Sequence, residues 1–136
     1  MRLSEFGDAG VLIVDDEKET LRSFSLLLKT AGLKNIITLE DPREALPVIR
    51  KNMIATVILD LRMPYLPGAE LLRMIKGEAP QIPLIIVTAS SELETAVECM
   101  KEGAFDYIVK PVEKERLLTS VKKALELSSL RDEISS

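Results

Sequence analysis

The sequence contains no histidine, no tryptophan and a single cysteine, Cys99. The absence of histidine excludes a Ser-His-Asp triad, a histidine general base and histidine metal ligands. One cysteine cannot form an intrachain disulfide or a cysteine-rich zinc site. We therefore expect an inert thiol at Cys99 and predict that any chemistry uses carboxylates, hydroxyls and lysine.

Long hydrophobic runs are also missing. The longest uncharged stretch, residues 79–91, has 13 residues and includes two prolines, whereas a membrane-spanning helix needs about 18–20 apolar residues. The first ten residues contain no apolar core of the signal-peptide type. We expect a cytoplasmic protein with no membrane partner.

Positive charge is not in excess. The chain has 18 Lys and Arg against 22 Asp and Glu, a net charge of −4, which disfavours direct binding of nucleic acid. Its 136 residues are 46% hydrophobic and 29% charged. This length and composition are typical of one globular domain with a core of its own.

Short apolar runs alternate with segments of helical periodicity. The apolar runs are residues 11–14, 36–39, 56–59, 84–87 and 107–109. An amphipathic helix is predicted after each run, and Gly32, Gly77 and Gly103 mark the ends of three of these helices. Buried strands that alternate with helices predict an α/β fold, a doubly wound five-stranded parallel sheet in a three-layer sandwich.

Two helix starts are predicted in more detail. Residues 41–44, Asp-Pro-Arg-Glu, are typical of an N-cap, a first-position proline and a third-position acid. Residues 91–94, Ser-Glu-Leu-Glu, predict a capping box. The helix after that box is expected to place Leu93, Val97 and Met100 on one face.

Four of the five predicted strands end in polar side chains. These are Asp15 and Asp16 after the first strand, Asp60 after the third, Thr88 after the fourth and Lys110 after the fifth. Because the carboxyl ends of parallel strands meet at one edge of a sheet, we expect all five side chains in one pocket. Each also has a structural interpretation when taken alone, as a helix cap, a turn residue or a solvated lysine.

Three carboxylates in one pocket repel one another, and a bound Mg²⁺ relieves this repulsion. Such a site has no base that could activate water. It suits phosphoryl transfer, which depends mainly on positioning and charge neutralisation. In such a site the middle carboxylate can serve as a nucleophile that forms an aspartyl phosphate.

Four blocks at these strand ends resemble the receiver domain of bacterial two-component response regulators, a CheY-like family with flavodoxin-like (βα)5 topology. The blocks are V-L-I-V-D-D-E, V-I-L-D-L-R-M-P-Y-L-P-G, I-I-V-T-A and F-D-Y-I-V-K-P. The resemblance predicts a receiver domain over residues 10–127, an N-terminal extension over 1–9, and a tail or the start of a linker helix over 128–136. Residues 88–111 also resemble NtrC-type receivers that precede a sigma-54-activating ATPase module.

The resemblance implies that Asp60 is the phosphoacceptor and that its phosphoryl group comes from a sensor histidine kinase. It implies Mg²⁺ as the cofactor, with Asp16 as a direct ligand and Asp15 partly through water. Asp60 and the backbone carbonyl of Arg62 are the further implied ligands. In the family, the positions of Arg62 and Ser90 tune the lifetime of the phosphate.

The remaining implied roles concern contact and switching. Lys110 and Thr88 would contact the phosphoryl group, and Lys110–Pro111 would be a cis peptide bond. Thr88 would move toward the phosphoryl group, and Tyr107 would turn inward behind it. A half-buried strand aromatic is an equal interpretation of Tyr107.

Together these implications predict a phosphorylation-dependent signalling switch rather than an enzyme, with only weak self-phosphorylation and autodephosphorylation. The face formed by the fourth helix and fifth strand would control an output domain or partner beyond this chain, in transcription regulation, and a homodimer could form on phosphorylation. Two alternatives remain, an unphosphorylated scaffold and an aspartyl-phosphate hydrolase. The hydrolase would need a second acid at the position of Arg62.

Overall fold

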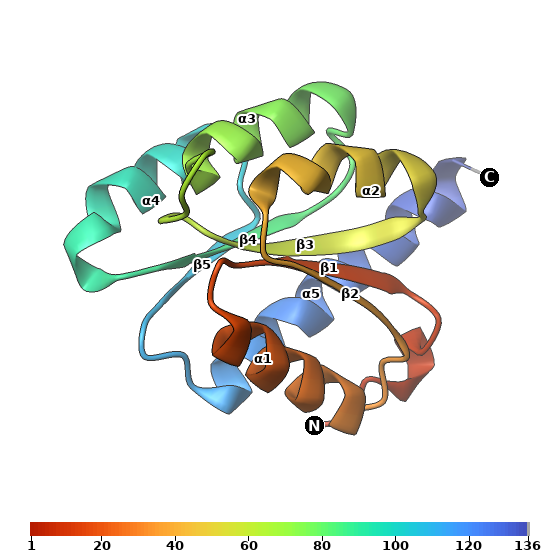
Figure 1. Cartoon of the computed structure of the whole chain (residues 1–136). Helices are drawn as coiled ribbons and strands as arrows, with labels where there is room; N and C mark the ends of the chain where they lie inside the picture. The colour runs from red at the N-terminus through yellow and green to blue at the C-terminus, as the bar shows by residue number, and fades with distance from the viewer. Residues whose placement is uncertain (136) are drawn as a thin grey trace.

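Five strands form one parallel sheet that lies between two layers of helices (Figure 1). The computed structural model describes residues 1–135, with side chains up to residue 132. The strands are β1 (Gly10–Val14), β2 (Asn35–Leu39), β3 (Ile54–Asp60), β4 (Leu84–Thr88) and β5 (Asp106–Val109). Their order is β2-β1-β3-β4-β5, and every neighbouring pair is parallel. This confirms the predicted doubly wound α/β sandwich.

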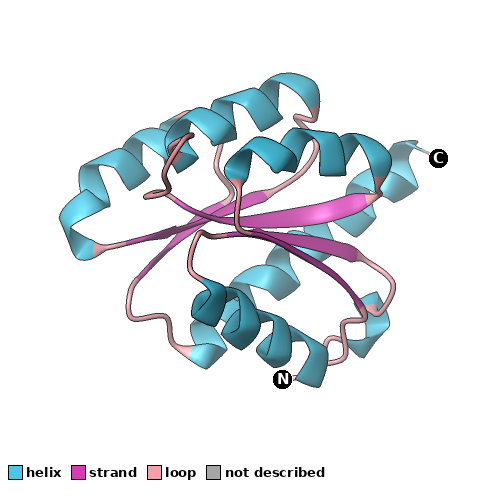
Figure 2. Ribbon diagram, in the orientation of Figure 1, coloured by secondary structure: helices cyan, strands magenta, loops and turns pink. Residues whose placement is uncertain are grey.

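Two helices cover one face of the sheet and three cover the other (Figure 2). The helices are α1 (Lys18–Thr30), α2 (Ala45–Lys51), α3 (Gly68–Glu78), α4 (Leu93–Lys101) and α5 (Lys114–Ser135), with 3-10 turns η1 (Ser4–Phe6), η2 (Pro42–Glu44) and η3 (Ser90–Glu92). In the described chain, none of these helices combines the length and apolarity that a membrane crossing requires.

Alternation along the strands divides the core into two halves. Successive strand side chains point to opposite faces, so Leu12 belongs to the half of the core on the side of α2, α3 and α4, whereas Ile13 belongs to the half on the side of α1 and α5. Both residues are almost fully buried. The sheet is therefore covered on both faces, and its polar strand ends are left at one edge.

The start of α2 differs from the prediction. Asp41 accepts a hydrogen bond from the Arg43 backbone N–H at 2.9 Å, and Pro42 follows it, but residues 42–44 form a 3-10 turn and the α-helix begins at Ala45. Pro47 explains the later start of the α-helix. It has no N–H to donate to the Arg43 carbonyl, so it would break a helix that began at residue 42. In the first turn of α2 the missing N–H costs little, because it would have no partner within the helix.

The predicted start of α4 is wrong, and the face that carries Leu93 and Val97 is not its buried face. No capping box forms, because residues 90–92 make the 3-10 turn η3 and the helix begins at Leu93 without a side-chain cap. The buried residues of α4 are Ala96 and Cys99, while Leu93 and Val97 are 40% and 45% exposed. Small side chains let the helix approach the sheet closely and turn its larger apolar groups toward solvent.

Described residues near both ends of the chain, among them Ser4 and Asp132, lie at the amino-terminal edge of the sheet. Leu3 is fully buried in the core beneath α1 and α5, and its N–H donates to the Ala31 carbonyl at 2.6 Å. At the other end α5 continues to Ser135 and leaves Leu130 56% exposed. The Ile134 side chain and residue 136, included in the predicted tail or linker helix, lie outside the described residues.

Candidate functional site

The carboxyl ends of β1 and β3 place Asp15 beside Asp60. Val14 is paired with Leu59 in the parallel register, so the residues that follow each of them emerge next to each other. One carboxylate oxygen from each of Asp15, Asp16 and Asp60 lies within 4.8 Å of the other two. The three acids that the sequence predicted in one pocket therefore do meet. We call them the aspartate cluster.

Asp15 is a buried member of the aspartate cluster, and its pKa is raised. Its side chain is 2% exposed, and Oδ1 accepts a hydrogen bond from the Glu17 backbone N–H at 2.9 Å. Burial raises the pKa of the Asp15 carboxyl, the Glu17 hydrogen bond lowers it and the charge of Asp60 raises it, and together these effects bring it to about 6. The folded chain thus holds a carboxylate where a negative charge is costly.

Asp60 is held at both of its oxygens. The Arg62 backbone N–H donates to Oδ1 at 3.1 Å, and the Lys110 ammonium donates to Oδ2 at 2.8 Å. Burial lowers the pKa of Lys110, but the hydrogen bond and charge of Asp60, with the charge of Asp15, outweigh this, so its pKa is raised overall. Lys110 therefore stays protonated at neutral pH, beside a carboxylate that is only 3% exposed.

The loop between β3 and α3 is closely fitted around Asp60. A Cβ on Gly68 would lie 2.2 Å from the Asp60 carbonyl oxygen, so only glycine fits there. Tyr65 has a φ of 70°, an unusual backbone conformation for an aromatic residue. Its ring lies under the Arg43 guanidinium, 4.2 Å from the centroid, and Arg43 also pairs with Asp41. The β2–α2 and β3–α3 loops thus support each other.

The predicted switch residues lie on β4 and β5. Thr88 is fully buried, and its hydroxyl donates to the carbonyls of Ala89 and Glu92 at 3.2 and 3.5 Å. Tyr107 is half-buried and packs against the core on the α2–α4 side. It pairs with Ile86 in the parallel register. The Lys110–Pro111 peptide bond that follows β5 is cis.

Arg62 and Ser90 are exposed beside this site. The Arg62 guanidinium forms an ion pair with the Glu92 carboxylate at the end of η3. Sequence reasoning missed Glu92 as a partner, because the two residues are 30 positions apart and belong to separate loops. No local pattern in the sequence indicates such a contact.

A second network, also missed, lies at the start of β5. Asp106 accepts hydrogen bonds from the Arg116 guanidinium at 2.8 and 3.0 Å and from the Ser120 hydroxyl at 2.7 Å. Burial raises the pKa of the Asp106 carboxyl, but these hydrogen bonds outweigh it and hold the pKa below its usual range. This network ties β5 to α5.

The donor set fits a hard divalent cation. Carboxylate oxygens are the ligands that Mg²⁺ prefers, and it commonly takes only one or two of them with water and phosphate oxygens. Asp16 is exposed, whereas Asp15 and Asp60 are buried, so the aspartate cluster opens to solvent on one side. With Lys110 adjacent, the site can hold a cation and an anionic group side by side.

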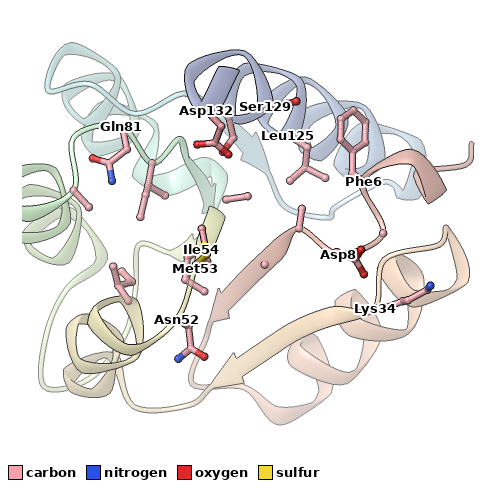
Figure 3. A pocket seen from close by; sticks show the side chains of 18 of the residues that line it. Phe6, Asp8, Lys34, Asn52, Met53, Ile54, Gln81, Leu125, Ser129 and Asp132 are labelled. Atoms are coloured by element: carbon pink, nitrogen blue, oxygen red, sulfur yellow. The ribbon is translucent and has the colours of Figure 1, made fainter. Parts of the chain in front are cut away.

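A separate groove of about 770 Å³ lies at the opposite edge of the sheet (Figure 3). Phe6, Lys34, Met53 and Leu125 are among the residues that line it. None of the residues of the aspartate cluster contributes to it. The charged site and this groove are therefore two distinct features of the fold.

Comparison with known proteins points to one family. Residues 11–122 match the response regulator receiver domain family. The chain is 36% identical to the C4-dicarboxylate transport transcriptional regulatory protein DctD of Pseudomonas aeruginosa over 120 residues, covering 88% of this chain and 26% of that protein. It is 37% identical to the transcriptional regulatory protein ZraR of Salmonella typhimurium over 119 residues, covering 88% and 27%. The chain thus spans about a quarter of the length of these relatives.

Solved structures agree with the sequence match. A response regulator receiver domain protein from Clostridium thermocellum superposes with a TM-score of 0.85 at 35% identity, over 90% of this chain and 98% of that one. NtrX from Brucella abortus gives a TM-score of 0.86 at 33% identity, over 94% of this chain and 29% of that chain. The similarity to NtrX, ZraR and DctD agrees with the expected resemblance to NtrC-type receivers.

Proposed function

This chain belongs to the response regulator receiver domain family, and we propose that it is a phosphorylation-dependent signalling switch in which Asp60 accepts the phosphoryl group. The phosphoryl donor would be a phosphohistidine of a sensor histidine kinase. Because the relatives are described as transcriptional regulators, the proposed output is transcription regulation, through a domain or partner beyond this chain.

One observation carries the proposal: Asp60 lies beside two other carboxylates and is in contact with a cation. One of its carboxylate oxygens lies within 4.8 Å of a carboxylate oxygen of Asp15 and of Asp16, and the Lys110 ammonium contacts Oδ2 at 2.8 Å. Mg²⁺, held by the aspartate cluster and the Arg62 carbonyl, would neutralise charge on the entering phosphoryl oxygens. Lys110 would bind that group from the other side.

The proposed step is a direct displacement at phosphorus. A carboxylate oxygen of Asp60 forms the new O–P bond as the P–N bond to the donor imidazole breaks, and the imidazole nitrogen keeps the electron pair. No proton has to leave Asp60, because it reacts as the carboxylate. This is compatible with a site that has no histidine.

The product would act through its charge. An aspartyl phosphate carries about −1.5 to −2 charges, if it resembles other phosphorylated side chains, and three strong acceptor oxygens. Thr88 would turn its hydroxyl from the Ala89 and Glu92 carbonyls toward these oxygens, and Tyr107 would turn inward behind it. A shift of this pre-existing equilibrium would change the face formed by α4 and β5 and could promote a homodimer.

The proposed switch acts in the cytoplasm, and two alternative functions can be told apart from it. A cytoplasmic signalling module without direct nucleic acid binding is compatible with the net charge of −4. An aspartyl-phosphate hydrolase is disfavoured, since Arg62 occupies the position where it needs an acid and pairs with Glu92. Steady turnover of a phosphate ester would support the hydrolase, and unmodified Asp60 would support a scaffold.

The test is intact-protein mass spectrometry after incubation with Mg²⁺ and a small acyl phosphate. One added phosphoryl group is expected on the natural sequence and none on Asp60→Asn. A purified phosphohistidine protein serves as the second donor, and Asp8→Asn, an exposed acid outside the site, is the matched control. If the natural sequence stays unmodified with both donors, the proposed function is wrong.

A further inference from the structure

Glu92 connects the predicted switch hydroxyl to the loop that carries the phosphoacceptor. Its backbone carbonyl accepts a hydrogen bond from the Thr88 hydroxyl at 3.5 Å. Its carboxylate forms the ion pair with the Arg62 guanidinium. Glu92 is also the last residue of η3, directly before α4. One residue thus joins Thr88, the first turn of α4 and the β3–α3 loop.

Arg62 lies between two negative groups. Its backbone N–H donates to Oδ1 of Asp60 at 3.1 Å, while its guanidinium pairs with Glu92. The hydrogen bond and charge of Glu92 raise the pKa of Arg62, and the charge of Asp60 adds to this effect, so the Asp60 carboxylate is within electrostatic reach of the guanidinium. Any negative charge added at Asp60 would therefore attract the Arg62 guanidinium more strongly.

A phosphoryl group would compete with Glu92 for this guanidinium. It brings more negative charge than one carboxylate and offers three acceptor oxygens, which suit the fork of an arginine. The Arg62 side chain is 74% exposed, so no packing holds it on Glu92. Once Arg62 leaves, the Glu92 carboxylate is no longer tied to the β3–α3 loop.

We propose that the Arg62–Glu92 ion pair holds η3 and the Thr88 hydroxyl in the unphosphorylated arrangement, and that Arg62 exchanges Glu92 for the phosphoryl group when Asp60 is modified. This inference rests on the proposed function. It makes Arg62 and Glu92 positioning residues, which set how readily the β4–α4 segment responds to phosphorylation. Because exposed ion pairs contribute little, the expected effect is about two- to fivefold.

The first measurement needs neither Mg²⁺ nor a phosphodonor. Glu92→Gln keeps the size of the side chain and removes its charge. Hydrogen exchange of the backbone amides of residues 89–95 is expected to become about two- to fivefold faster in this variant. Arg62→Gln should give the same acceleration, and the double variant should add nothing further, since either change breaks the same ion pair. Equal exchange rates in Glu92→Gln and the natural sequence would overturn the inference.

The matched control is Glu94→Gln. Glu94 lies in the first turn of α4 and is exposed, and it makes no ion pair with any residue in the described part of the chain. It therefore reports the effect of losing one negative charge near the start of this helix. Acceleration of the same size in Glu94→Gln would assign the effect to the helix rather than to Arg62, and would also overturn the inference.

The second measurement is the affinity for beryllium fluoride, a mimic of the phosphoryl group, in the presence of Mg²⁺. Glu92→Gln is expected to bind it about two- to fivefold more tightly than the natural sequence, because Arg62 no longer has to leave a partner. In the Arg62→Gln background the Glu92→Gln change should have no effect. An equal effect in both backgrounds would show that Glu92 acts without Arg62.

The two proposals fail in different ways. If the natural sequence binds no beryllium fluoride and accepts no phosphoryl group, the proposed function is wrong and this inference fails with it. If it does both, but Glu92→Gln leaves amide exchange and affinity unchanged, only the role of the ion pair is wrong. Thermal unfolding of each variant confirms that the comparison is made between folded proteins.

Discussion

The Lys110 ammonium lies 2.8 Å from Oδ2 of Asp60, although the two residues are 50 positions apart in the chain. Lys110 follows β5 and Asp60 ends β3, with β4 between them in the sheet. A carboxylate that is 3% exposed and a lysine side chain that is 34% exposed are thus joined across the strand ends. This contact places a positive charge against one of the three clustered carboxylates.

This contact predicts a coupling between Lys110 and Asp60. In a double-mutant cycle of Lys110→Gln and Asp60→Asn, measured by urea unfolding without Mg²⁺, we expect a coupling free energy of about 1 kcal/mol. The expected coupling free energy is small because about a third of the lysine side chain is exposed to water. The control cycle is Arg22→Gln with Glu19→Gln, an ion pair whose side chains are 76% and 87% exposed. Equal coupling in both cycles would contradict the prediction.

We predict that the charge of Asp15 lowers the free energy of unfolding when no cation is bound to the aspartate cluster. Burial raises the pKa of Asp15 to about 6, so the folded state loses stability as the pH rises from about 4 through 6. Asp15→Asn keeps an acceptor for the Glu17 N–H and removes the charge. At pH 7 with EDTA it should raise the free energy of unfolding by on the order of 2 kcal/mol.

Mg²⁺ should stabilise the natural sequence more than the Asp15→Asn variant. Saturating Mg²⁺ is expected to raise the melting temperature of the natural sequence much more than that of Asp15→Asn, since a ligand that binds only the folded state stabilises it. Asp8→Asn, an exposed acid, is the control for the loss of one charge. A lower melting temperature for Asp15→Asn in EDTA, or an equal gain with Mg²⁺, would refute this account of the cluster.

Two glycines in α3 are predicted to respond in opposite directions. A Cβ on Gly68 would meet the Asp60 carbonyl at 2.2 Å, whereas a Cβ on Gly77 would meet nothing within 4 Å. Gly68→Ala should therefore lower the free energy of unfolding by about 2 kcal/mol. Gly77→Ala should raise it by about 0.5–1 kcal/mol, because alanine is the better helix former. Chemical denaturation measures both, and two changes of the same sign would contradict the prediction.

The Asp106 network predicts a pH-dependent contribution to stability. Its hydrogen bonds to Arg116 and Ser120 outweigh burial and lower the pKa of Asp106. A lowered carboxyl pKa gives stability that is present above about pH 3.9 and is lost as the pH falls through the native value. Asp106→Asn should cost about 1–2 kcal/mol at pH 7.

The free energies of unfolding of Asp106→Asn and the natural sequence should become more similar as the pH falls from 4 to 2. Urea unfolding at each pH measures both. Asp132→Asn, an exposed acid of α5, should show no such trend. A constant difference over this range would mean that packing, not the charge of Asp106, stabilises the folded state at this position.

The buried Leu3 predicts that the folded unit begins before the family match at residue 11. Leu3 is fully buried, so Leu3→Ala should cost about 2–5 kcal/mol. Leu26→Ala, at a position that is 69% exposed, should change the free energy of unfolding by less than about 0.5 kcal/mol. Similar melting temperatures for the two variants would show that residues 1–9 are a dispensable extension.

Much of the fold could be predicted because it depends on local pattern. Apolar runs placed every strand to within a few residues, and helical periodicity predicted a helix after each strand. The rule for parallel strand ends predicted that Asp15 and Asp60 would meet. The errors occurred where local pattern competes with packing. Residues 91–94 have the letters of a capping box, yet Ala96 and Cys99 pack against the sheet and the segment before them forms a 3-10 turn instead.

Residue types and their order were enough to predict the parallel sheet and its acidic edge, since strand alternation and strand termini follow directly from periodicity. The pairing of Arg62 with Glu92 and the burial of Leu3 became visible only in three dimensions. Each depends on how separate segments are placed by the packed core, and neither leaves a periodic signal along the chain. The acidic residues that meet at this site could therefore be predicted from the sequence, whereas the contacts that position them come from packing.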